Sequence, residues 1–178
     1  MKTRKLTRIV AVLAVTLGLT ISGATAANAA VGPGGNVITC SVSLDNPHQS
    51  GHVNGTISAQ GRVTCTGVVN EIYIKTSLRK VTNNTVASQT FDSFNVNFGS
   101  SVGAKPCSDG PATFKSQADV LVHFPAGYTP TPQTTNKYSP NVSVACGAAR
   151  IAPTATAGAS ESEDFGTTTW TITAVKND

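Results

Sequence analysis

Charged side chains are scarce in this chain, and so are the residue types that most often form catalytic or metal sites. Charged residues make up 12% of its 178 residues and aromatic residues 6%, and it has three histidines and four cysteines. Four of the 13 Lys and Arg residues lie within the first 30 positions, which leaves nine basic and nine acidic residues after them. A chain that is formally neutral beyond residue 30 lacks the basic surface that nucleic acids and anionic membranes attract. We therefore expect no nucleic-acid partner.

Motifs that mark common catalytic sites are also missing from the sequence. It contains no glycine-rich phosphate loop and no dinucleotide fingerprint. A glycosidase needs two carboxyl groups about 5–10 Å apart in a cleft. Most acidic residues are isolated at turns or at outward strand positions, namely Asp45, Glu71, Asp92, Asp109 and Asp119. We predict no catalytic residue, no cofactor and no enzymatic activity.

The sequence offers no good metal site either. The cysteines are far apart, whereas structural zinc sites use cysteine pairs at short spacing. His48 and His52 are four residues apart, but they lie in a turn rich in Pro, Gly and Ser, where that spacing gives no assurance that they meet. An acidic cluster at 160–164 lacks the residue pattern of a calcium-binding loop. We predict that no metal is bound.

The first 30 residues have the three parts of a secretory signal peptide. Basic residues open the segment, an apolar stretch runs from Ile9 to Ile21, and small residues follow at 26–30. The apolar stretch is shorter than the ~20 residues that a membrane-spanning helix needs. We predict cleavage after Ala29 or Ala30, a secreted extracellular protein with no membrane contact after signal removal, and an actinobacterial source.

Beyond the signal, apolar and polar residues alternate with the period of two that is typical of β-strands. The segments with this pattern are 37–44, 53–66, 71–81, 94–98, 112–124, 142–146 and 169–174. In 53–66 the predicted inward residues start at Val53, and in 94–98 they are Phe94, Val96 and Phe98. About seven short strands separated by turn residues predict an all-β fold, an immunoglobulin-like antiparallel β-sandwich. A small barrel is the alternative.

The four cysteines support this domain as two disulfides. Of the three possible pairings we favour Cys40–Cys65 and Cys107–Cys146, because each joins core-facing positions in consecutive segments. We predict a signal peptide at 1–30, a β-sandwich domain at 31–146, a flexible linker at 147–165 and a C-terminal strand or tail at 166–178. A Pro- and Thr-rich loop is expected at 129–141. The domain is expected to be a monomer.

Exposed aromatic residues are the usual contacts in recognition of sugars and proteins. By alternation Tyr73 points away from the core, and Tyr138 lies in the Pro- and Thr-rich loop. Tyr128 follows a strand end, where it either contributes to a surface or packs against a corner of the sandwich. We predict a binding surface formed by Tyr73, Tyr128 and Tyr138, and a core position for Trp170.

Two stretches give the chain a resemblance to a group of small secreted actinobacterial β-domain proteins of unknown function. The first runs from Asn46-Pro47-His48 through Arg62-Val63-Thr64-Cys65 to Leu78-Arg79, and the second runs from Cys107 through Phe124-Pro125 to Cys146. The resemblance covers about 40–146. It implies a secreted β-domain and no particular activity.

Three functions are compatible with these features. We favour a non-enzymatic extracellular module that binds an extracellular protein or polysaccharide or associates with a surface. The first alternative is a protease inhibitor or toxin-type protein that would use an exposed loop at 129–141 or 99–106. The second is a carrier of a small apolar ligand, which the Ala-, Gly-, Thr- and Val-rich composition suggests.

Overall fold

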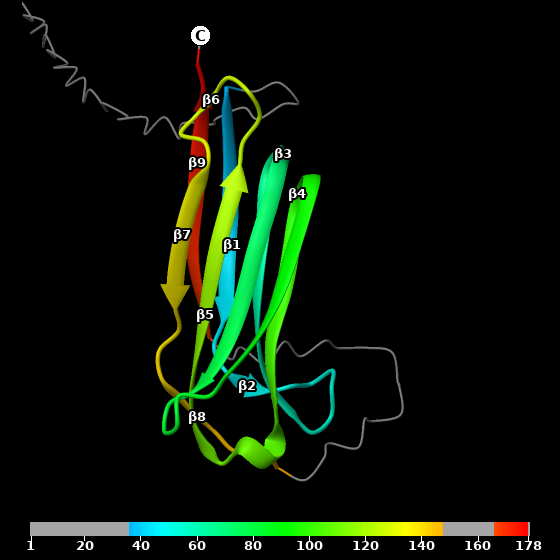
Figure 1. Cartoon of the computed structure of the whole chain (residues 1–178), viewed down its shortest axis with the longest axis vertical. Coiled ribbons are helices and arrows are strands. Elements are labelled where there is room, and N and C mark those ends of the chain that lie inside the picture. The colour runs from blue at the N-terminus through cyan, green and yellow to red at the C-terminus, as the bar shows by residue number, and fades with distance from the viewer. Residues whose placement is uncertain (1–35, 148–165, 178) are drawn as a thin grey trace, which may run out of the picture.

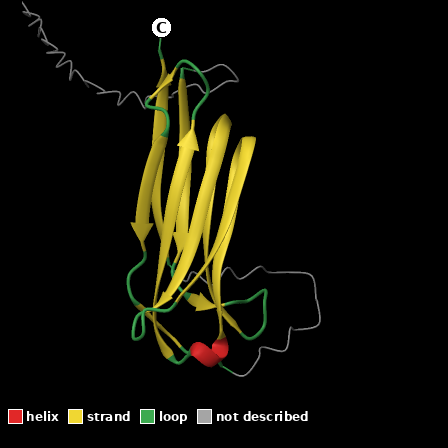
Figure 2. Ribbon diagram, in the orientation of Figure 1, coloured by secondary structure: helices red, strands yellow, loops and turns green. Residues whose placement is uncertain are grey.

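The chain folds as an all-β domain. The structure is a computed structural model that describes residues 36–147 and 166–177. The predicted signal peptide, most of the predicted linker and Asp178 lie outside these residues. Figure 2 shows strands almost throughout the described part, with one short 3-10 helix. The elements are β1 (Val37–Asp45), β2 (His48–Gln49), β3 (Thr56–Lys80), β4 (Val86–Pro106), η1 (Cys107–Asp109), β5 (Ala112–His123), β6 (Tyr128–Thr129), β7 (Gln133–Tyr138), β8 (Val142–Val144) and β9 (Thr167–Lys176).

Hydrogen bonds join the strands of the described residues in one nine-stranded antiparallel sheet. The main order is β6-β9-β1-β3-β5-β7; off this path, β2 and β4 pair with β3, and β8 pairs with β5. The predicted all-β class and the two disulfides are confirmed. The strands number nine in place of about seven, and they belong to one sheet where the sequence predicted two.

The long hairpin of β3 and β4 gives this single sheet two layers. The first half of β3 pairs with β1, and its second half pairs with β5. The register between β3 and β4 shifts between Thr64 and Val69, which marks a β-bulge or irregularity. Bulges bend strands and increase their twist. In Figure 1 the hairpin folds back on itself, so that β5 and β7 lie in front of β1 and β9.

Contacts between the two halves of the hairpin demonstrate that the layers face each other. Gly61 lies in the first half of β3, and a Cβ atom built on it would be 2.5 Å from the Oγ1 atom of Thr76 in the second half. The Thr76 hydroxyl forms a 2.7 Å hydrogen bond with the Ser101 hydroxyl of β4 inside the molecule. At the opposite margin, the Gln133 Nε2 atom of β7 donates to the Thr173 carbonyl of β9.

The core between the layers consists of the residues that alternation predicted for most strands. β5 shows this best, since it alternates buried and half-buried residues from Phe114 to His123. The main cluster contains buried residues from both layers, and Trp170 packs partly buried against it. Its largest members include Leu44, Val63, Ile72, Ile74, Val122 and Phe124.

Two stretches of the predicted core are wrong. Val53 is 59% exposed, because it lies in the turn before β3 begins at Thr56. On β4, Phe94 is 64% exposed and Phe98 is 48% exposed, while Val96 between them packs against the core. Asn95 has a φ of 54°. A left-handed residue in a strand interrupts the regular alternation, so a strict period of two misplaces these phenylalanines.

Both expected disulfides are present. Cys40 and Cys65 are direct partners in the register of β1 and β3, and both are buried in the main core cluster. Cys107 at the start of η1 is bonded to Cys146 after β8. The first disulfide therefore joins two paired strands, and the second joins η1 to the segment after β8.

The C-terminal segment is part of the sheet. β9 pairs with the whole of β1, from Val37 opposite Val175 to Asp45 opposite Thr167. The region 129–141, expected as a loop, contains β7, which pairs with β5 from Gln117 opposite Tyr138 to Val122 opposite Gln133. The Pro and Thr residues of this stretch are typical of a loop, so the sequence did not indicate a strand. The prolines at 130, 132 and 140 lie on either side of β7 and do not interrupt it.

Candidate binding groove on the outer sheet face

Side chains of β3, β5 and β7 that point away from the core meet in regular rows on the outer face of one layer. Tyr73 on β3 is opposite Leu121 on β5, which is opposite Thr134 on β7. In the next row, Lys75, Asp119 and Asn136 follow one another in the same way. The register therefore places residues that are far apart in the sequence within one small area.

This face contains an open groove with a volume of about 650 Å³. The groove is a depression in the sheet surface that stays accessible to solvent. Acidic, aromatic, aliphatic and neutral polar residues all contribute to it. Its lining consists of Glu71, Tyr73, Asp119, Val120, Leu121, Thr134, Thr135 and Asn136.

Glu71 at one end of the groove is oriented by a histidine. Glu71 and His123 are direct cross-strand partners, and the His123 Nδ1 atom contacts the Glu71 Oε2 atom in a close hydrogen bond or ion pair. The glutamate side chain is 18% exposed and the imidazole 40%. Within the described residues the second oxygen of Glu71, Oε1, receives no hydrogen bond and is free to accept one from a ligand.

Asp119 is held in a similar way. Its Oδ1 atom accepts a 2.7 Å hydrogen bond from the Gln117 Nε2 atom, two residues earlier on the same face of β5. Its Oδ2 atom receives no hydrogen bond from the described part of the chain. Each carboxylate of the groove thus has one oxygen that fixes its position and one that is available to a ligand.

The three predicted tyrosines have different environments. Tyr73 lines the groove, as a surface residue must. Tyr138 is 48% exposed on the same sheet face, and the Lys115 Nζ atom lies 4.7 Å from the centre of its ring. Tyr128 is only 9% exposed and belongs to the main core cluster. The prediction that Tyr128 contributes to a binding surface is therefore wrong, because β6 turns its side chain inward.

Sequence reasoning missed most of the groove lining. Glu71 and Asp119 appeared as isolated acids, since nothing in the sequence states that β3 and β5 are neighbours. Thr134, Thr135 and Asn136 lie in the stretch that was expected to be a loop. The outward parity of Leu121 was visible in the alternation of 112–124, but alternation alone does not distinguish a groove from an ordinary solvated face.

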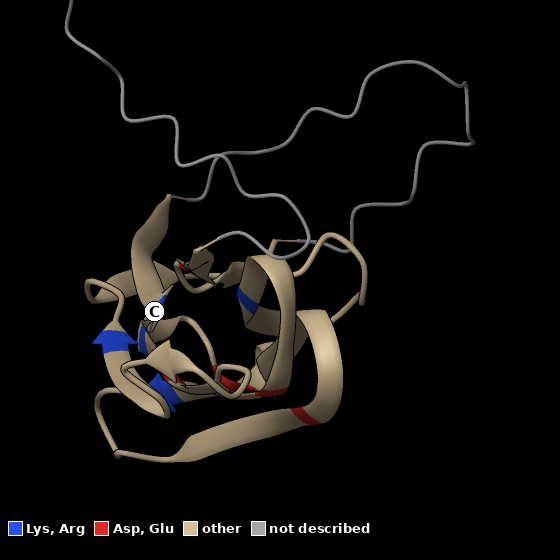
Figure 3. Cartoon of the chain, turned by 90° about the horizontal axis from the view of Figure 1, so that it is seen from above, with Lys and Arg blue, Asp and Glu red and all other residues tan. Residues whose placement is uncertain are grey.

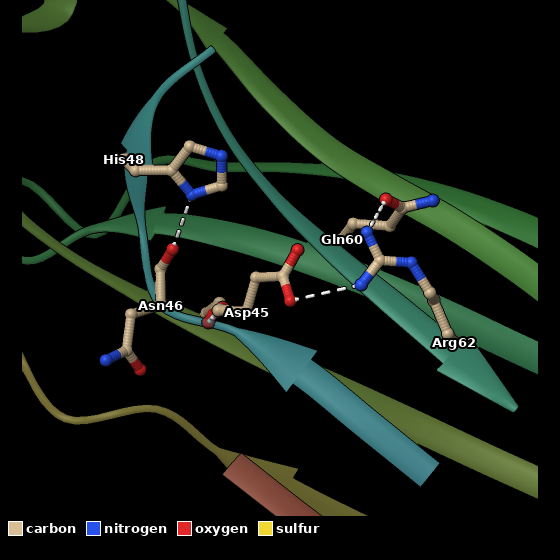
Figure 4. A network of polar contacts seen from close by, with 6 residues as sticks. Asp45, Asn46, His48, Gln60 and Arg62 are labelled. Atoms are coloured by element: carbon tan, nitrogen blue, oxygen red, sulfur yellow. Dashed lines mark hydrogen bonds and ion pairs between the residues drawn. The ribbon is translucent and has the colours of Figure 1, made fainter. Parts of the chain in front are cut away.

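Of the two histidines of the first turn, His48 belongs to a separate group of polar contacts at the end of β1, shown in Figure 4. The His48 Nδ1 atom donates a 2.8 Å hydrogen bond to the Asn46 carbonyl. Nearby, the Arg62 guanidinium forms an ion pair of 3.3 Å with Asp45 and also donates to the Gln60 side-chain oxygen. His52 is exposed in the following turn. Across residues 36–147 and 166–177, no three His, Cys, Asp or Glu residues form a group that could hold a metal ion.

Charged residues are few and dispersed over the domain, as Figure 3 shows. None of the helical structure in the described residues is long and apolar enough to cross a membrane. Comparisons of the chain with protein-family models, with curated proteins and with solved structures find no match. The groove is therefore interpreted from its own chemistry.

Proposed function

We propose that this chain is a secreted, non-enzymatic binding module that holds its ligand in the groove on the outer face of β3, β5 and β7. The observation that supports this most directly is the composition of the groove. A half-buried aromatic ring, an aliphatic neighbour and several oriented polar groups converge in one depression. Binding sites generally combine apolar surface with a few well-placed polar groups in this way.

The other expectations from the sequence form part of the proposal. They are export by the signal peptide, an actinobacterial source, membership of the group that the chain resembles, and a monomeric state. The two disulfides are compatible with an oxidising extracellular location. The two facing layers also support the proposal that the domain is an immunoglobulin-like sandwich.

Two features make the alternatives less suitable. An inhibitor would present an exposed loop to its protease, but residues 99–106 lie within β4 and residues 133–138 form β7. A carrier of a small apolar ligand would enclose it, whereas the groove is open and polar residues make up much of its lining. An open groove with a mixed apolar and polar lining is better suited to a ligand that stays partly in solvent.

A pull-down with the oxidised, secreted protein tests the proposed function. The immobilised protein is incubated with insoluble polysaccharides, whole cells and culture-supernatant proteins, and bound material is identified by mass spectrometry and sugar analysis. We expect a saturable partner that is lost with Tyr73→Ala and kept with Phe98→Ala. The control removes an exposed aromatic ring from the half of β4 that pairs with the first half of β3, away from the groove. A partner retained equally by both variants would place the binding site elsewhere.

A further inference from the structure

We infer that the ligand of the groove is an internal segment of a neutral polysaccharide. This inference rests on the proposed function and adds to it the chemical class of the ligand. Three properties of the groove support it: its apolar centre, the state of its carboxylates, and the balance of charge around it.

The centre of the groove provides a surface for the apolar face of a sugar ring. Tyr73 and Leu121 stand opposite each other on β3 and β5, and both line the groove. Pyranose rings present C–H groups on their faces and hydroxyl groups around their edges. An aromatic ring offers a large apolar area with little conformational entropy to lose. The pair is therefore suited to contact a ring face while leaving the ring edge to polar groups.

The polar residues around this centre match the edge of such a ring. Glu71 Oε1 and Asp119 Oδ2 are available acceptors at two positions of the groove, and Asn136 and Thr134 on β7 supply both donors and acceptors. A hydroxyl group of a sugar both donates and accepts hydrogen bonds. Carboxylates whose other oxygen is already bound to His123 or Gln117 are oriented before the ligand arrives, which lowers the entropy cost of binding.

The charge around the groove selects a neutral ligand over an ionic one. Lys75 is the cross-strand partner of Asp119, and His123 is the partner of Glu71. Acidic and basic residues occur together on the same outer face, namely Glu71, Asp92 and Asp119 with Lys75, Arg79 and Lys115. A polycation or a polyanion would meet like charges here, and such contacts reduce affinity. A neutral chain meets no such repulsion.

The open form of the groove indicates that the ligand is part of a longer chain. The groove lies on the outer face of a sheet and is not enclosed, so no wall blocks a chain that extends beyond it. A pocket for a free monosaccharide would surround the ring and bury most of its surface. We therefore expect recognition of an internal segment of the chain.

Affinity electrophoresis of the full oxidised protein in native gels tests this inference. The gels contain a soluble neutral polysaccharide (a β-glucan, a xylan, a galactomannan or a neutral cell-wall glycan fraction), polygalacturonate as the polyanion, or polylysine as the polycation. We expect retardation by at least one neutral polysaccharide. Tyr73→Ala is expected to weaken it by about 10-fold or more, as for the central aromatic residue of a binding site.

Asp119→Asn and Phe98→Ala complete the design. Asp119→Asn keeps the shape of the side chain but changes an acceptor into a partial donor, so we expect weaker binding to the same polysaccharide. Phe98→Ala is expected to bind like the wild type. Binding of a neutral polymer is also expected to change little with salt, whereas ionic binding weakens as salt rises.

The outcomes separate this inference from the proposed function. Retardation by polygalacturonate or polylysine alone, or by no polysaccharide at all, overturns the inference. If the pull-down then yields a protein partner whose binding is lost in the Tyr73→Ala variant, the groove is still the proposed binding site, but its ligand is a protein and not a polysaccharide. If every partner binds Tyr73→Ala as well as the wild type, both the inference and the proposed function are wrong.

Discussion

Gly61 packs directly against Thr76, although both residues belong to the same strand, β3. A Cβ atom on Gly61 would lie 2.5 Å from the Thr76 Oγ1 atom and 2.9 Å from the Ile74 Cδ1 atom. A straight strand could not bring positions 61 and 76 together, so this contact follows from the fold-back of the β3–β4 hairpin (Figure 1). It also explains why the position needs a glycine, because only a residue without a side chain lets the two layers approach this closely.

Gly61→Ala is therefore expected to destabilise the protein. The added methyl group must displace buried neighbours, and overpacking of this kind costs about 1–3 kcal/mol. The change in free energy of unfolding is measured by urea denaturation of the oxidised protein. Gly51→Ala is the matched control, because a Cβ atom at Gly51 meets no atom within 4 Å. Equal stability of the two variants would contradict the close packing of the layers.

Phe114 and Phe94 provide a second comparison, since the alternation of the sequence assigned both to the core. Phe114 is fully buried, whereas Phe94 is 64% exposed. We expect Phe114→Ala to lower the free energy of unfolding by about 3–5 kcal/mol and Phe94→Ala by about 0.5 kcal/mol or less. Thermal and urea denaturation of both variants measure this difference. A large loss for Phe94→Ala would mean that this side chain packs inward after all.

The two disulfides are expected to contribute different amounts to the free energy of unfolding. Their effects on the entropy of the unfolded chain are similar, but their packing in the folded core differs. In the chain-entropy model each contributes about 3–4 kcal/mol. Cys40 and Cys65 are also buried in the main core cluster, whereas Cys107 and Cys146 are only partly buried beside a smaller one. Replacing both cysteines of a pair with alanine, followed by denaturation, should therefore show the larger loss for Cys40 and Cys65. The reverse order would indicate that the 107–146 link determines the stability of the domain.

Lys105 is a buried cation at the end of β4. Its Nζ atom forms 3.2 Å contacts with the Asp109 carboxylate and the Thr85 hydroxyl, and its side chain is 9% exposed. Asp109→Asn would leave this charge without its anionic partner, and we expect a loss of about 1–3 kcal/mol, because Asp109 itself is 33% exposed and the pair is only partly buried. Adding Lys105→Met to that variant removes the buried charge and is expected to restore part of the stability. A double-mutant cycle by urea denaturation measures the coupling, and additive effects would show that the pair is not coupled.

How far the sequence predicts this fold depends on the regularity of each strand. For β1 and β5 the alternation assigns the buried residues correctly, because both faces of these strands have uniform environments. For β4 it fails, because Asn95 adopts a positive φ where the hairpin bends, and the side chains of Phe94 and Phe98 end in solvent. For β7 it fails because flanking prolines resemble the composition of a loop.

The candidate site could be predicted only in part. Tyr73 was identified from its outward parity, which is a local property of β3. The neighbours that make Tyr73 part of a groove come from β5 and β7, and no local signal specifies which strands become adjacent. Tyr128 illustrates the opposite error, since an aromatic residue at a strand end has no parity and its burial depends on how β6 packs.

By itself the sequence determined the all-β class, the inward faces of the regular strands and the favoured pairing of the four cysteines. These properties depend on side-chain period and on positions along single strands, so short stretches of sequence contain them. Only the tertiary structure decided that β3 bends onto itself, that all strands join one sheet, and that Glu71, Asp119 and Asn136 meet in one groove. Those outcomes depend on which strands pair and in which register, and that choice is made by the packing of the whole core.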